Sequence, residues 1–77
     1  MDEDSKKRLL EDLSELEHVQ WMEWSMVLAK TETLEPSRLV KWKECWKEYS
    51  ELTEAQKEQD RIYARRVLQI VGRYLGE

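Results

Sequence analysis

The sequence predicts an all-α fold, a small three-helix bundle with a long first helix. Only two Gly and one Pro occur among its 77 residues, so few positions interrupt a helix. Apolar residues recur every three or four positions over most of the chain, which is the spacing of one helix face. Residues 1–77 are expected to form a single domain, because a chain of this length holds one small core.

The first helix is expected from about Asp4 to Ala29 or Lys30, with Asp4 or Ser5 as its N-cap. The first half of this helix carries leucines at helical spacing among charged residues. The second half carries tryptophans and methionines over a wide arc of its surface, including Trp21, Trp24 and Met26. This half is therefore expected either in the core or at an interface.

Residues 31–35 form the first connection, and Pro36 suits the first turn of a second helix, where its missing N–H has no partner to lose. This helix is expected to extend to about Glu48. Its apolar positions have the spacing i, i+3, i+7 and i+10, which would place them on one face. They are Leu39, Trp42, Trp46 and Tyr49.

An ordered turn is expected at residues 49–53, because Thr53 and Gln56 have the spacing of a capping box that begins the next helix. Leu52 precedes the cap and is expected to pack back against it. The third helix is expected from about Glu54 to Arg73. Its apolar positions cover a broad face, so it is predicted to be the hydrophobic centre of the bundle, buried on more than one side. Gly72 and Gly76 mark its end.

Charge and cysteine content exclude several classes of protein. The net charge of −4 argues against a nucleic-acid or anionic-membrane binder. Residues 1–35 hold ten acids and four bases, whereas residues 36–77 hold seven acids and nine bases. This asymmetry indicates an acidic helix packed beside more basic ones, or a bipolar surface that recognises a partner or a small anion. Cys45 has no second cysteine to pair with, which favours a reducing, cytoplasmic location.

The first seven residues are acidic and polar and no apolar segment follows them, so no signal peptide is expected. No apolar run approaches the ~18 residues that a membrane-spanning helix requires. We therefore expect no membrane-spanning segment.

The run from Trp46 to Arg61 is the most distinctive part of the chain. From Tyr49 to Arg61 it resembles the signature of the ryanodine-receptor repeat domain, with a Tyr, an acidic-Leu pair, a capped helix start, a Lys, an acid and Asp-Arg. Upstream, His18-Val-Gln-Trp21 is similar to the His-x-x-Trp of that family. The resemblance covers residues 18–72 and is nearest to short stand-alone prokaryotic and phage members. The chain departs from the repeat between these motifs, where a helix replaces a longer Gly-containing segment.

This resemblance implies a peripheral cytoplasmic module rather than a pore or an enzyme. In prokaryotes the family implies a sensor of nucleotide-type ligands in signalling or defence, and many short members are phage or prophage proteins.

His18 and the pair Asp60-Arg61 are the strongest candidate site residues. His18 is expected either to be a buried histidine bonded to a backbone group or to a carboxylate such as Asp60, or to contact a ligand. Asp60-Arg61 is expected either to brace the turn at Tyr49 or, through Arg61, to bind a phosphate or carboxylate. Lys57 and Arg65 lie one turn on either side of Arg61, which predicts a basic row.

The tryptophans and Cys45 have structural and functional interpretations as well. The four tryptophans, Trp21, Trp24, Trp42 and Trp46, are expected in the core, with at least one partly exposed and able to stack a ring or anchor a partner. Cys45 is expected at a boundary position, and a nucleophilic role would require His18 nearby as a base. A zinc site would require three or four ligands, which the lone His18 and Cys45 do not supply.

The leading hypothesis is a non-enzymatic interaction module without a cofactor that acts through a protein partner or by self-association. Trp21, Trp24 or Met26 would be buried at the contact, and charges at its rim would set the orientation. The alternative is a sensor or sponge for a nucleotide-like anion, with Arg61, Arg65 and His18 supplying charge and Tyr49 or a tryptophan stacking.

Overall fold

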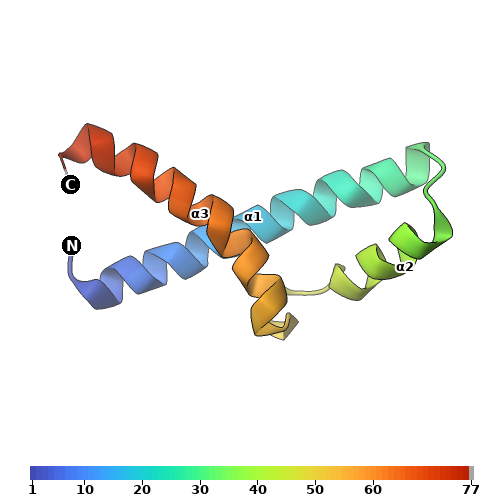
Figure 1. Ribbon diagram of the computed structural model, residues 1–77, viewed down its shortest axis with the longest axis horizontal. Coiled ribbons are helices and arrows are strands. Elements are labelled where there is room, and N and C mark those ends of the chain that lie inside the picture. The colour runs from blue at the N-terminus through green and yellow to red at the C-terminus, as the bar shows by residue number, and fades with distance from the viewer. Residues whose placement is uncertain (77) are drawn as a thin grey trace.

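The computed structural model describes residues 1–76, which form three α-helices and one short 3-10 helix (Figure 1). The α-helices are α1 (Glu3–Thr31), α2 (Pro36–Cys45) and α3 (Glu54–Leu75), and the 3-10 helix η1 is Tyr49–Glu51. This confirms the predicted all-α fold with a long first helix. No helix within the described residues is both long and apolar enough to cross a membrane.

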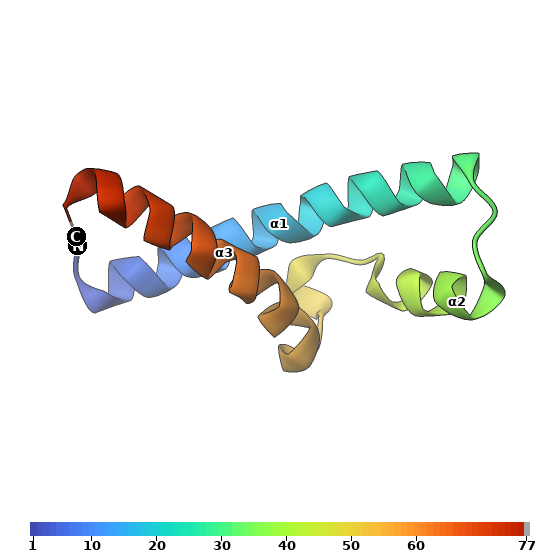
Figure 2. The ribbon, with the colours of Figure 1, turned by 45° about the horizontal axis from the view of Figure 1, so that its top comes forward.

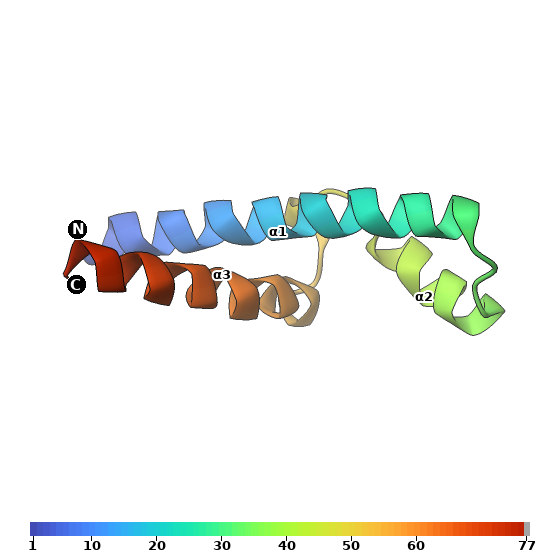
Figure 3. The same ribbon diagram turned by 90° about the horizontal axis from the view of Figure 1, so that it is seen from above.

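The helices form a flat, open arrangement rather than a closed bundle. α3 crosses α1 obliquely, and α2 lies beside the second half of α1 (Figures 1 and 2). Seen from above, α1 forms one layer while α3 and α2 form the other (Figure 3). The Cα atoms extend over 45 × 24 × 14 Å, so the molecule is about two helices thick.

The N-cap of α1 is Asp2, whose Oδ1 accepts a hydrogen bond of 2.7 Å from the backbone N–H of Ser5. The prediction of Asp4 or Ser5 as the cap was therefore wrong. α1 begins at Glu3, so Glu3 and Asp4 lie in its first turn, where the positive end of the helix dipole stabilises acids.

α2 ends at Cys45, three residues before the predicted Glu48. Trp46 has φ −81° and ψ 71°, outside the helical region, so neither Trp46 nor Tyr49 shares a face with Trp42. The physical reason is tertiary hydrogen bonding to α1. The Trp46 indole N–H donates to Ser25 Oγ over 2.9 Å, and the backbone carbonyl of Lys47 accepts a hydrogen bond from His18.

The turn at residues 49–53 and the capping box of α3 are confirmed. Gln56 N–H donates to Thr53 Oγ1 over 3.2 Å, and Thr53 N–H donates to Gln56 Oε1 over 2.9 Å. Leu52 is buried directly before this cap. Each of these two backbone donors is one that the start of a helix leaves without an intrahelical partner.

α3 continues through Gly72 to Leu75, two residues beyond the predicted end, and stops at Gly76. Gly76 adopts φ +76°, a left-handed conformation that a residue without Cβ adopts at low cost. The prediction that α3 is the buried centre was wrong, because Ala64 is its one buried residue. α1 packs along one side of α3, the first turns of α3 also contact Cys45 and Tyr49, and most of its other side chains lie at the surface.

The buried residues are few, and the fully buried ones among them are small. Among the apolar side chains of residues 1–76, Tyr49, Leu52 and Ala64 are the buried ones. Ser14 and Ala64 are fully buried, and small side chains of this kind let two crossing helices approach closely. Ser14 Oγ donates to the carbonyl of Leu10 over 2.7 Å, so its burial leaves no hydroxyl without a partner.

Candidate functional site

A cleft of about 530 Å³ lies between the middle of α1, the end of α2 and the first half of α3. From α1 its lining residues are Glu17, His18, Gln20, Trp21 and Trp24. From α3 they are Gln56, Gln59, Asp60 and Tyr63, and Cys45 and Leu52 complete the wall. The volume lies in the range of about 300–1,000 Å³ that small-molecule sites occupy.

His18 is held on two sides, as the structural interpretation of this residue predicts. Its Nε2 lies 2.7 Å from the Lys47 carbonyl, and its Nδ1 lies 3.6 Å from Asp60 Oδ2. A carbonyl only accepts hydrogen bonds, so Nε2 carries a hydrogen, and Nδ1 is the ring nitrogen that faces Asp60. The ring is 3% exposed and stacks on Trp21 with 6.0 Å between centroids. His18 therefore ties α1 to the end of α2 and to α3.

The electrostatics of the cleft are those of two neighbouring carboxylates. Burial raises the pKa of the Asp60 carboxyl, the charge of His18 lowers it, and the negative charge of Glu17 raises it further. No lysine or arginine lines the cleft. The cleft therefore disfavours an anion.

Glu11 connects three elements and was missed by the sequence analysis. Its carboxylate accepts from Arg61 Nε at 3.0 Å and from Arg61 Nη2 at 2.6 Å, and it also accepts the hydroxyl hydrogen of Tyr49. Arg61 holds the pKa of Glu11 below its usual value, whereas burial and the bond to Glu11 raise the pKa of Tyr49 to about 12. No local spacing marks Glu11, because both of its partners are far away in sequence.

Asp60 and Arg61 are adjacent in sequence, but their side chains take part in two separate groups of contacts. Asp60 faces His18 in the cleft, whereas Arg61 points to Glu11. Successive residues on a helix differ by about 100° in direction, so the two side chains leave α3 on different sides. The interpretation that Arg61 braces the turn at Tyr49 agrees with this geometry, since both residues bond to Glu11.

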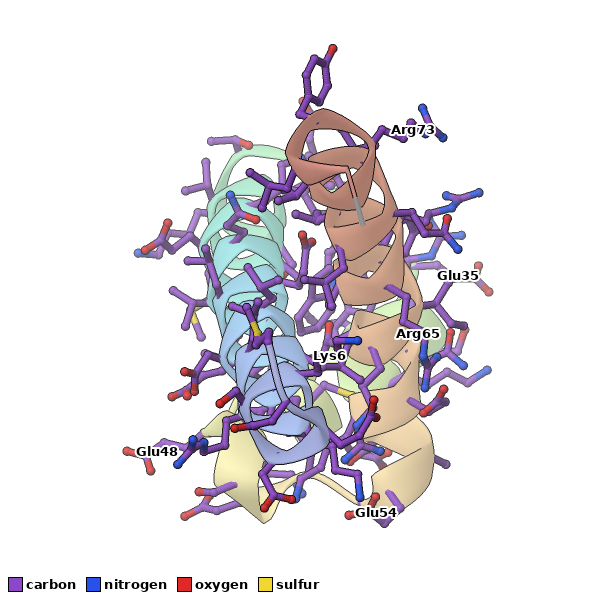
Figure 4. The ribbon with its side chains drawn as sticks, turned by 90° about the vertical axis from the view of Figure 1, so that its left-hand side faces the viewer. Lys6, Glu35, Glu48, Glu54, Arg65 and Arg73 are labelled. Atoms are coloured by element: carbon purple, nitrogen blue, oxygen red, sulfur yellow. The ribbon has the colours of Figure 1, made fainter. Side chains whose placement is uncertain are left out.

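The predicted basic row on α3 is present, but acids neutralise it. Arg61 also pairs with Glu54 at 3.0 Å and with Glu58 at 3.6 Å, and Arg65 pairs with Glu58 at 2.6 Å. Lys57 lies 3.7 Å from Glu54. Glu54 and Glu58 belong to α3 itself, so acids on the same helix supply most of the counter-charge. Arg65 projects from the flank of α3 that faces away from α1 (Figure 4).

The tryptophans cluster, but none of the four is fully buried. Trp42 packs against Trp21 edge-on at 5.9 Å and against Trp24 at 5.7 Å between centroids. Trp24 is 58% exposed, which agrees with the expectation that at least one indole meets solvent. The prediction that the tryptophans form the core was wrong in part. Trp21, Trp42 and Trp46 are half-buried rather than buried, because only two layers of helices are present to cover them.

Cys45 is half-buried, and its Sγ lies 3.6 Å from Gln56 Nε2. Burial, and then the charge of Glu44, raises the pKa of this thiol, which keeps it protonated and weakly nucleophilic. His18, Cys45 and Asp60 do line one cleft, but both ring nitrogens of His18 already face other partners. Within residues 1–76, no three histidine, cysteine or acidic side chains gather closely enough to hold a metal ion.

No family model matches this sequence, and neither a curated protein nor a solved structure matches it. The resemblance of residues 18–72 to the ryanodine-receptor repeat remains a prediction.

Proposed function

We propose that the chain is a small non-enzymatic interaction module whose partner is a second copy of itself. The supporting observation is its surface area. The folded chain exposes 6118 Å², whereas a compact monomer of 9.4 kDa is expected to expose about 5,000 Å². The excess is roughly 1,100 Å², and a stable complex covers about 800 Å² of each partner. The excess is therefore large enough to supply one partner's share of a stable interface with a second copy.

The shape of the chain supports the same proposal. Its radius of gyration is 14.9 Å, whereas a compact domain of this length is expected to have about 11.5 Å. A flat pair of layers buries one face of each helix and leaves the other open. Stacking a second copy on an open face would give these helices the second covering layer that closed bundles have.

The outer stripe of α3 is the surface that we propose for this contact. It consists of Tyr63, Val67, Ile70 and Tyr74, spaced four, three and four residues apart. Tyr63 is 56% exposed, Ile70 51% and Tyr74 87%. This spacing matches the apolar seam of a helix that packs against a partner helix. The exposed Trp24 on α1 adds apolar surface, whereas Trp21 is half-buried between His18 and Trp42 and has a packing role.

Sedimentation equilibrium over micromolar to millimolar concentration tests this proposal. We expect the mass to rise toward twice 9.4 kDa as the concentration increases. Ile70→Glu should weaken the dimer at least about tenfold, because the interface would then bury a charge without a partner. Gln69→Glu makes the same change of charge on a neighbouring exposed position outside the stripe, so it should leave the dimer nearly unchanged. Circular dichroism verifies that both variants remain helical.

A mass that stays at 9.4 kDa throughout the range would reject self-association. Equal weakening by Gln69→Glu and Ile70→Glu would instead reject the outer stripe as the interface.

A sensor or sponge for a nucleotide-like anion has less support. Arg61 and Arg65 lie in ion pairs with acids, and the cleft presents Glu17 and Asp60. A cytoplasmic location and a phage or prophage origin are further proposals, which rest on the lone cysteine and on the family resemblance.

A further inference from the structure

The cleft combines aromatic rings and carboxylates, and no lysine or arginine lines it; its one histidine, His18, is 3% exposed. Trp21 and Trp24 contribute indoles from α1, and Tyr63 contributes a phenol ring from α3. Glu17 and Asp60 contribute carboxylates from opposite sides. Aromatic faces carry negative electrostatic potential, so rings and carboxylates attract the same kind of group, a cation.

Neither carboxylate of the cleft, Glu17 on α1 or Asp60 on α3, pairs with an arginine as the neighbouring acids of α3 do. Glu54 and Glu58 both pair with arginine. Glu17, by contrast, has no ion pair within residues 1–76, and the one ion-pair partner of Asp60 there is His18, whose Nδ1 lies 3.6 Å from Oδ2. Glu17 and Asp60 also repel each other: burial is the main cause of the raised pKa of Asp60, and the negative charge of Glu17 adds to it. A positive group between them would remove this repulsion.

The remaining lining residues suit a group that donates hydrogen bonds and carries an apolar stem. The amides of Gln20 and Gln59 have no hydrogen-bond partner in the described part of the chain, so their oxygens are available to N–H donors. The half-buried Trp21 and the buried Leu52 provide apolar contact for a hydrocarbon stem. The volume of about 530 Å³ is ample for such a group.

We propose that this cleft binds an organic cation, an alkylammonium or guanidinium group, held between Glu17 and Asp60 and against the ring of Trp21 or Trp24. The group is supplied either by a free amine or by a lysine or arginine side chain of a polypeptide. This ligand has the opposite charge to the nucleotide-like anion expected from the sequence. The proposal stands without self-association, because Tyr63 is the one residue that the cleft and the outer stripe of α3 share.

Tryptophan fluorescence tests the proposal, since two of the four indoles line the cleft. n-Butylammonium chloride and n-butanol share the same alkyl chain and differ in charge, and sodium chloride matches the ionic strength. We expect a saturable change with n-butylammonium that n-butanol and adenosine monophosphate do not produce. Isothermal calorimetry under the same conditions gives an independent measure of binding.

Variants of the cleft locate the site. Glu17→Gln and Asp60→Asn preserve side-chain shape and should each weaken n-butylammonium binding about tenfold, because each removes a charge that faces the cation. Glu23→Gln is the matched control, since Glu23 is exposed on α1 outside the cleft and has no ion pair in the described residues. It should leave the affinity unchanged. A urea titration of each variant verifies folding.

Two peptide probes distinguish the sources of the cation. A capped tripeptide with a central arginine is compared with the same peptide containing neutral citrulline. Binding of the arginine peptide at least about tenfold tighter than n-butylammonium indicates a side chain of a polypeptide, and equal affinity indicates a free amine. The proposal is overturned if n-butanol binds as well as n-butylammonium, if neither method detects the cation, or if Glu23→Gln weakens binding as much as the cleft variants.

Discussion

Replacing Glu11 with glutamine should destabilise the fold more than any comparable surface change on α1. The Glu11 carboxylate joins α1 to α3 through Arg61 and to η1 through Tyr49. Glutamine has the same shape, but it carries no charge and has one acceptor oxygen in place of two. Arg61 and Tyr49 therefore lose the anion that both of them approach.

The expected cost follows from the number and exposure of these bonds. Hydrogen bonds to charged groups contribute about 1.5–3 kcal/mol each when they are well shielded. Here the Glu11 side chain is 44% exposed, and Arg61 keeps its pairs with Glu54 and Glu58, so water and those acids offset much of the loss. We expect Glu11→Gln to lower the free energy of unfolding by about 1.5 kcal/mol, which corresponds to a fall of about 6–12 °C in Tm for a domain of this size.

Urea and thermal denaturation followed by circular dichroism measure this change. All variants are compared at one protein concentration, since self-association would add to the apparent stability. Glu15→Gln is the control, because Glu15 lies one turn further along α1, is exposed and has no ion pair within residues 1–76. Combining Glu11→Gln with Tyr49→Phe gives a double-mutant cycle, for which we expect a coupling of about 0.5–1 kcal/mol.

The proposed role of Glu11 would be refuted if Glu11→Gln cost no more than Glu15→Gln. A coupling near zero in the cycle would instead show that the Tyr49 hydroxyl contributes nothing through this carboxylate.

Two further predictions concern pH and the cap of α3. The pKa of Tyr49 is raised from 10.0 to about 12 in the folded chain, so its contribution to stability is complete below pH 10.0 and is lost as the pH rises to about 12. The pKa of Glu11 is lowered from 4.5, so its contribution is present above pH 4.5 and is lost as the pH falls below that value. Urea midpoints measured against pH should show both losses, and Tyr49→Phe should abolish the alkaline one. Thr53→Ala removes the side chain that accepts from Gln56 N–H and should cost about 1 kcal/mol of unfolding free energy, whereas Thr53→Ser should retain most of it.

The cap of α3 and the starts of α2 and α3 could be predicted from the sequence, because they depend on residues a few positions apart. The capping box at Thr53 and Gln56 is one example, since both of its hydrogen bonds form within four residues. The start of α2 at Pro36 is another. The end of α2 was misplaced because Trp46 leaves the helix to bond with Ser25, a residue 21 positions earlier.

Only some residues of the candidate site could be predicted from the sequence. His18 and Asp60 were identified as a pair, because each is an unusual residue at a distinctive place in the sequence, and the structure brings them within 3.6 Å. Glu11 and Glu17 were not identified, because they are two of ten acids in the first 35 residues and nothing local separates them from solvated ones.

By itself the sequence determined the helical class, the approximate helices and the caps, since backbone hydrogen bonds and periodicity operate within a few residues. Only the tertiary structure decided which faces are covered and which acid meets which base. α3 carries apolar residues on several sides, yet one helix packs against it, so Ile70 and Tyr74 remain exposed. The crossing of α1 and α3 sends Arg61 to Glu11 and leaves Asp60 with Glu17 in a cleft that no lysine or arginine side chain lines. Contacts of this kind join residues about 40 to 50 positions apart, and their choice depends on how whole helices pack.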